Sequence, residues 1–318
     1  MILELSTRYP VYKLCEEMGI NRSGFYKWFK RLKNPNAKEA ERIFYIEIFE
    51  YYHTLYPSHG YRWLNAFIKN DLGLMISNAY AHKICKYAMI QSNAKHARRT
   101  GIKTSEKELK AYPNLVLKAM HIDEPFQVVV SDMTAFWANG VYYELTLFMD
   151  LYNNEIVAYS LSNKKGDPNT YHKALLEVLL KKKEYMDFET ILHTDQGSVY
   201  SSKKFNESLP LYNITHSMSR AGKPTDNGAM EAINGWAKEE LFIDFNINEC
   251  DDVPKMIEDY IYFFNYKRPS FVLKYLTPIQ FKEQHLVQTK YIKRKQLKNE
   301  ALVELCIQLN TLCILKKQ

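Results

Sequence analysis

The sequence contains few cysteines and no pattern that would use them together. Five cysteines are scattered over 318 residues, with no Cys-x-x-Cys pair and no His/Cys cluster at zinc spacing. They are Cys15, Cys85, Cys250, Cys306 and Cys313. An odd, scattered set of thiols argues against a disulfide framework and indicates a reducing compartment. The sequence therefore predicts no zinc site.

Long hydrophobic runs are also missing. A membrane-spanning helix needs about 20 consecutive apolar residues, and every apolar run in this sequence is far shorter. No charged start followed by an apolar stretch indicates a signal peptide. We therefore expect no membrane association and a cytoplasmic protein.

Positive charge is in excess, and its distribution says more than the net charge of +7. Residues 111–281 carry 16 basic and 23 acidic side chains, whereas residues 83–110 carry 8 and 2, and residues 282–318 carry 8 and 3. An acidic centre between basic flanks fits a core that gathers metal ions and arms that attract nucleic-acid phosphates. Taken alone, these charge runs also fit solvated surfaces.

Three carboxylates stand where buried elements end or begin. Asp132 follows the apolar run 126–131, which predicts a strand that ends there, and Asp195 follows the strand-like run 190–192. Glu231 falls just inside a helix that opens after a turn-rich stretch. Each alone has an ordinary explanation, as a turn residue, a cap or a charge at a helix dipole. Together they offer the hard oxygen ligands that a pair of divalent metal ions needs.

Seven blocks of sequence occur in an order typical of one protein family. They are SGFYKWFKR (23–31), YHTLYPSHGYR (52–62), SDMTAF (131–136), FMDLYNNEIVAYSLS (148–162), HTDQGSVYSS (193–202), SMSRAGKPTDNGAMEAINGWAKEEL (217–241) and FNYKRPSFVLKYLTPIQF (264–281). In this order they resemble the catalytic OrfB half of frameshifting bacterial insertion-sequence transposases. These transposases belong to the DDE transposase and retroviral integrase superfamily.

The resemblance implies an α/β fold. We expect a ribonuclease H-like integrase catalytic core, a mixed sheet flanked by helices, preceded by all-α helix-turn-helix-like DNA-binding units. The expected division is 1–37 (helix-turn-helix-like), 38–92 (helical auxiliary domain), 93–113 (basic linker), 114–284 (catalytic core) and 285–318 (basic tail). Residues 11–31 predict two helices around a turn, the second capped near Ser23. A small packing hairpin would give the same pattern.

The resemblance also implies the roles of several residues. Asp132, Asp195 and Glu231 would be catalytic and would hold two Mg²⁺ ions, for which Mn²⁺ would substitute. Lys238 lies seven residues after Glu231, on nearly the same helix face, where the family uses a cation to bind a phosphate. An exposed lysine would explain that spacing equally. His193 shares a strand face with Asp195 and would orient a ligand or approach DNA, or simply be a hydrogen-bonded structural residue.

Further cations outside this cluster are expected to contact DNA. They lie in the loop before Glu231, in the basic linker and on the second helix of the first unit: Arg220, Lys223, Arg98, Arg99, Lys27 and Arg31. Asp150 is the nearest rival carboxylate, and its position beside a turn between strands favours a structural role.

The expected function is Mg²⁺-dependent cleavage at the ends of an insertion sequence, followed by transfer of the strands into target DNA. The alternatives are a noncatalytic DNA-binding regulator of transposition and a ribonuclease H-like nuclease or resolvase. Expected partners are the terminal inverted repeats, target DNA and further copies of the chain in a homo-oligomer, in a bacterial nucleoid. The sequence starts at the OrfB-like segment, so we expect an OrfA partner or an OrfA–OrfB frameshift fusion.

Overall fold

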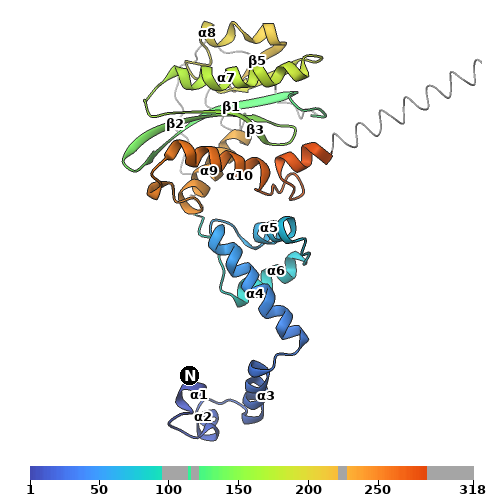
Figure 1. Cartoon of the computed structure of the whole chain (residues 1–318), viewed down its shortest axis with the longest axis vertical. Coiled ribbons are helices and arrows are strands. Elements are labelled where there is room, and N and C mark those ends of the chain that lie inside the picture. Colours follow the sequence, from blue (N-terminus) through green and yellow to red (C-terminus); the bar gives the residue numbers. More distant parts are fainter. Residues whose placement is uncertain (95–113, 116–121, 221–227, 285–318) are drawn as a thin grey trace, which may run out of the picture. The chain divides into compact units, whose positions relative to one another are not determined.

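The computed structural model describes residues 1–94, 114–115, 122–220 and 228–284 (Figure 1). The chain divides into two compact units, an amino-terminal unit (Met1–Ser92) and a core unit (Asn93–Gln318). The finer five-part division stays a prediction, because most of the expected linker and the whole expected tail lie outside the described residues. No helix in the described ranges is long and apolar enough to cross a membrane.

The amino-terminal unit begins with three helices around a very small core. They are α1 (Ile2–Leu5), α2 (Val11–Glu17) and α3 (Arg22–Lys33), so the two predicted helices are present. The predicted cap at Ser23 is wrong. Asn21 has the extended backbone of an N-cap and its side chain accepts a hydrogen bond of 3.1 Å from the Gly24 amide. Only Ile2, Cys15 and Phe25 form the buried cluster of these helices.

The second part of this unit contains α4 (Ala37–Leu55), α5 (Tyr61–Leu72) and α6 (Asn78–Tyr87). Gly73 ends α5 with a positive φ of 68°, which glycine adopts without steric cost. Ser77 caps α6, accepting a hydrogen bond from the Tyr80 amide. Phe49, Leu64, Phe67 and Ile84 are fully buried between these helices.

The core unit is built on a five-stranded sheet with the order β3-β2-β1-β4-β5. The strands are β1 (Val128–Ala138), β2 (Val141–Asp150), β3 (Glu155–Ser162), β4 (Thr190–Thr194) and β5 (Ile214–Met218). The first three strands are antiparallel, and β4 and β5 run parallel to β1. β1 pairs with β4 through Val128–Val130 and with β2 through Val129–Ala138. The expected mixed sheet is confirmed.

Helices cover both faces of the sheet (Figure 1). On one side lie α7 (Pro168–Lys182), which continues into η1 (Lys183–Tyr185), and α8 (Lys203–Asn206), followed by η2 (Leu209–Tyr212). On the other side lie α9 (Gly228–Ile243), η4 (Ile247–Glu249) and α10 (Val253–Tyr266). The main hydrophobic cluster packs strand residues such as Val129, Phe148 and Leu192 against Leu175 and Val178 of α7. The flanking helices are confirmed.

A buried ion pair ties α9 to the end of α10. The Arg268 Nε lies 2.7 Å from Glu240 Oε1, and the Tyr260 hydroxyl donates a 2.9 Å hydrogen bond to Glu240 Oε2. The side chains of Arg268 and Glu240 are 5% and 0% exposed, and the guanidinium also lies over the Phe264 ring, 5.2 Å from its centroid. Burial raises the pKa of Glu240, against the opposing effect of Arg268. The ionised form of Glu240 is therefore stabilised by the charge of Arg268.

Candidate active site

Two aspartates lie just beyond the paired part of β1 and β4. Side chains alternate along a strand, and Val129 points into the cluster beneath α7, so Asp132 on β1 points the opposite way, towards α9. The parallel register ends with Val130 opposite His193, two residues before each aspartate. Asp195 follows the end of β4, and its charge adds to the effect of burial in raising the pKa of Asp132. The predicted strand end at Asp132 is wrong, because β1 continues to Ala138 by pairing with β2.

The turn after β4 holds the Asp195 carboxylate from its own backbone. The Gly197 amide donates a hydrogen bond of 2.9 Å to Asp195 Oδ1. A Cβ atom at residue 197 would lie 2.9 Å from the same oxygen, closer than such atoms approach without displacement. The backbone N–H of residue 197 supplies the hydrogen bond, and the absence of a Cβ atom at this glycine leaves space for the carboxylate.

The helix α9 brings an acidic and an amide side chain to the same place. Asn234 Nδ2 donates a hydrogen bond of 2.9 Å to Asp132 Oδ2, which fixes α9 against β1. Glu231, half-buried, lies three residues earlier and its charge raises the pKa of Asp132. Sequence reasoning missed Asn234, although Glu231, Asn234 and Lys238 share one face at intervals of three and four residues.

The carboxylates interact electrostatically. Burial first, then the charges of Asp195 and Glu231, raise the pKa of Asp132 to about 6, against the hydrogen bonds from Met133 and Asn234. Burial by surrounding protein atoms also raises the pKa of Asp195, although its side chain retains exposed surface. Within the described ranges, no three His, Cys, Asp or Glu side chains come close enough to form a finished metal site. The three acids are neighbours with unfavourable mutual charge, which a cation would neutralise.

This electrostatic strain predicts a pH-dependent stability. A carboxyl whose pKa is 3.8 when unfolded and about 6 when folded stabilises the fold fully below its unfolded pKa, and this contribution is lost as the pH rises through 6. In EDTA at pH 7, we therefore expect Asp132→Asn to be more stable than wild type by roughly 1–3 kcal/mol. The advantage should disappear near pH 3.5. Urea unfolding at both pH values measures the difference, and equal stabilities at pH 7 would contradict it.

His193 is a structural residue of the sheet. It is fully buried, and its Nδ1 and Nε2 atoms lie 2.9 Å and 3.0 Å from the hydroxyls of Ser217 and Ser219. Of the alternatives that the sequence leaves open, hydrogen bonding within the fold is the one its geometry favours. Asp150 is likewise structural, since it accepts hydrogen bonds from the Phe126 and Tyr152 amides.

The other cations expected at DNA are distributed over both units. In the core unit, Lys238 is half-buried on α9 and Arg220 is exposed after β5. In the amino-terminal unit, Lys27 and Arg31 are exposed on α3. Lys223, Arg98 and Arg99 lie outside the described residues. DNA contact at all of these positions stays a prediction.

Two family models match the core unit. Both are described as an integrase core domain, and they match residues 123–224 and 231–286. The matched stretches contain the two aspartates and Glu231, respectively.

Relatives extend the similarity over more of the chain. The transposase for insertion sequence element IS904 of Lactococcus lactis is 30% identical over 192 residues, covering 59% of this chain and 72% of the relative. The protein InsK of insertion sequence element IS150 from Escherichia coli is 28% identical over 283 residues, covering 88% and 96%. Among solved structures, the HTLV-2 integrase catalytic core domain in complex with magnesium aligns with a TM-score of 0.39 and 19% identity, covering 49% of this chain and 96% of that one.

Proposed function

The chain belongs to the insertion-sequence transposases that carry an integrase core domain, and from this premise we propose that it cuts and joins DNA strands at the ends of its element. The observation that carries this proposal is the position of Asp195, after β4, and Glu231, on α9, near enough to Asp132 on β1 for both charges to add to the effect of burial in raising its pKa. The Asn234–Asp132 hydrogen bond fixes the helix that supplies Glu231. Burial and the charges of Asp195 and Glu231 raise the pKa of Asp132, so the grouping of acids does not stabilise the sheet.

The residues present fit divalent metal ions. Asp132, Asp195 and Glu231 supply hard oxygen ligands from a strand, the turn after a strand and a helix. Burial first, and then the charges of Asp195 and Glu231, raise the pKa of Asp132. Bound Mg²⁺, or Mn²⁺ in its place, would act as a Lewis acid toward the attacking and leaving oxygens of an in-line displacement. Two such ions are the number we propose.

The chain's own residues position the reacting groups. Asn234 holds Asp132 through its amide, and Gly197 holds Asp195 through its backbone N–H. Lys238 lies two helical turns beyond Glu231 on the same face of α9, where its ammonium would bind a DNA phosphate beside the one that reacts. These groups would orient the DNA strand and the carboxylates so that the nucleophile approaches in line.

DNA binding by the remaining cations is part of the same proposal. Lys27 and Arg31 on α3, Arg220 and Lys223 before α9, and Arg98 and Arg99 in the basic segment would supply nonspecific attraction to phosphates. The DNA partners would be the terminal inverted repeats and the target. Assembly as a homo-oligomer, and an OrfA partner or frameshift fusion, also belong to the proposal.

The test is a strand-transfer assay with purified protein. A labelled duplex carrying the inverted repeats that flank the gene is incubated with Mg²⁺, with Mn²⁺ or with EDTA, and nicked and joined products are separated. Metal-dependent joining supports the proposal. Cleavage without joining would favour a nuclease, and binding without cleavage in any metal would favour a regulator.

A single methyl group at residue 197 should impair this reaction without unfolding the protein. In Gly197→Ala the new Cβ would meet Asp195 Oδ1 at 2.9 Å, so the carboxylate must move. A displacement of this kind commonly costs about 10- to 100-fold in rate, and we expect such a loss of strand transfer. The control is Gly235→Ala on α9, where a Cβ meets nothing within 4 Å. Equal activities for the two variants would exclude a positioning role for Gly197.

A further inference from the structure

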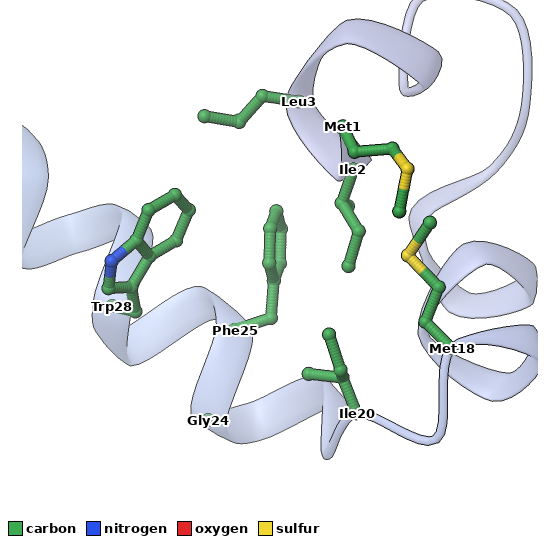
Figure 2. Close-up of a pocket in the computed structure, with 8 residues that line it drawn as sticks. All are labelled: Met1, Ile2, Leu3, Met18, Ile20, Gly24, Phe25 and Trp28. Atoms are coloured by element: carbon green, nitrogen blue, oxygen red, sulfur yellow. The ribbon is translucent and has the colours of Figure 1, made fainter.

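An open apolar groove lies between α1, α3 and the turn that joins α2 to α3. It encloses about 410 Å³ and is lined by Met1, Ile2, Leu3, Met18, Ile20, Gly24, Phe25 and Trp28. Figure 2 shows Phe25 and Ile2 projecting into it from opposite sides, with Trp28 beside Phe25 on α3. Met1, Ile20 and Trp28 are 72%, 45% and 45% exposed. A surface of this kind on so small a core indicates a binding partner.

The groove continues along α3. Leu32 lies four residues after Trp28, on the same helix face, and is 58% exposed. Lys27 and Arg31 lie three residues after Gly24 and Trp28 respectively, on the flank of that face; both are exposed, and Arg31 Nε lies 4.0 Å from Glu39 Oε1 at the start of α4. The groove is therefore apolar along its length and positively charged along one side. Its partner should present an apolar ridge with acidic side chains beside it.

The helix α4 carries such a ridge. Phe44, Ile48, Tyr51 and Leu55 follow one another at intervals of four, three and four residues, the spacing of a helix seam that packs on another surface. Phe44, Tyr51 and Leu55 are 49%, 60% and 41% exposed. Buried residues of α4, such as Phe49 and Tyr52, lie on its other face. The ridge is thus additional to the face that packs within the unit.

Acidic residues flank this ridge. Glu41 lies three residues before Phe44, and Glu47 lies three after Phe44 and four before Tyr51. Both glutamates are exposed. A groove with Lys27 and Arg31 beside it and a ridge with Glu41 and Glu47 beside it are complementary in charge and in apolar character. Groove against groove, or ridge against ridge, would bring like charges together.

We propose that two copies of this chain associate through their amino-terminal units, the α4 ridge of each copy seated in the α1–α3 groove of the other. Such an exchange is closed by a two-fold axis and forms the same contact twice. It removes Trp28, Phe44 and Tyr51 from water together with the groove lining. The association does not depend on the carboxylate chemistry, so it can fail or hold independently of the proposed strand transfer.

The test uses the full chain without DNA and measures its mass by light scattering across a dilution series. The wild type should be a dimer. Trp28→Glu places a negative charge in the groove, and Phe44→Lys places a positive charge on the ridge. We expect either change alone to raise the dimer dissociation constant by roughly 100-fold, since exposed aromatic anchors dominate interfaces of this type. Tyr26→Glu and Ile43→Lys, at equally exposed positions off the groove and ridge, should remain dimers.

Mixing the Trp28→Glu and Phe44→Lys variants distinguishes a contact between ridge and groove from a contact between two grooves or two ridges. In a mixed pair, the intact groove of the Phe44→Lys copy receives the intact ridge of the Trp28→Glu copy, so dimers should return. If the mixture stays monomeric, the exchange of ridge and groove is wrong. A monomeric wild type would also overturn it. Circular dichroism checks folding, and Leu32→Glu, outside the buried cluster, replaces Trp28→Glu if that variant unfolds.

Discussion

Asp132→Asn is expected to abolish strand transfer while leaving DNA binding nearly unchanged. The substitution keeps the shape of the side chain and an oxygen that can accept the Asn234 hydrogen bond of 2.9 Å, but it removes the negative charge that would hold a divalent cation. Loss of such a ligand should lower the rate by at least about 1,000-fold. Asp195→Asn and Glu231→Gln should behave alike, because the three acids would act as one unit.

The control variant makes the same Asp-to-Asn change at a position outside the candidate active site. Asp251→Asn serves, because Asp251 is exposed in the turn before α10. Mn²⁺ binding followed by calorimetry gives a readout besides activity: wild type and Asp251→Asn should bind the ion, and Asp132→Asn should bind it far more weakly. Strand transfer at wild-type rates by any of the three site variants would refute the catalytic assignment.

Removing Arg268 should be the most destabilising single change among these positions. Arg268→Met leaves Glu240, which is 0% exposed, with the Tyr260 hydroxyl but without its cation. A buried carboxylate that loses its partner costs about 3–5 kcal/mol. Because burial already raises the pKa of Glu240, the variant should regain stability on acidification, as the carboxyl becomes neutral. Urea denaturation at pH 7.5 and pH 5 measures both effects.

The double variant Arg268→Met/Glu240→Met tests the reason for that loss. Replacing both charges by apolar side chains of similar length leaves no uncompensated ion, so the double variant should be more stable than the single variant. It should remain below wild type by about 1–3 kcal/mol, because the buried Tyr260 hydroxyl loses Glu240 as its acceptor. If Arg268→Met is as stable as wild type, or if the double variant is less stable than Arg268→Met, then the charge of Arg268 does not stabilise a buried, ionised Glu240.

Much of the core fold and of the candidate active site could be predicted because these parts depend on local sequence patterns. Apolar runs with period two mark the strands, and the alternation of side chains places Asp132 and Asp195 on the same face once β1 and β4 are parallel. The helix that carries Glu231 begins after a turn-rich stretch and keeps its helical period through Ile243. The positions of the two aspartates and of the helix that carries Glu231 can thus be predicted from the sequence.

The other features depend on contacts between residues that are far apart in the sequence, which a local sequence pattern does not show. Asp132 lies within a long strand because β2 continues to pair beyond it, and an apolar run cannot show where a neighbour ends. Asn21 is the cap because it has the extended backbone before the first turn, whereas Ser23 already lies within α3. Asn234 is an ordinary polar helix residue until α9 packs on β1. The groove on α3 and the ridge on α4 are patterns of exposure, which only coordinates provide.

The ion pair between Arg268 and Glu240 anchors the carboxyl-terminal half of α9, so a movement there is transmitted along the helix to Glu231. Ala237, Glu240 and Leu241 are buried in the carboxyl-terminal half of the helix, and Met230 and Asn234 are buried in the half that carries Glu231. Glu231 lies nine residues before Glu240, about 14 Å along the axis. A tilt of a few degrees at the ion pair would therefore move Glu231 by nearly an ångström. Amide exchange should be slowest around Leu241 and faster toward Gly228. Substitutions at Arg268 that still fold would then resemble active-site lesions in a genetic screen, although Arg268 touches no reacting atom.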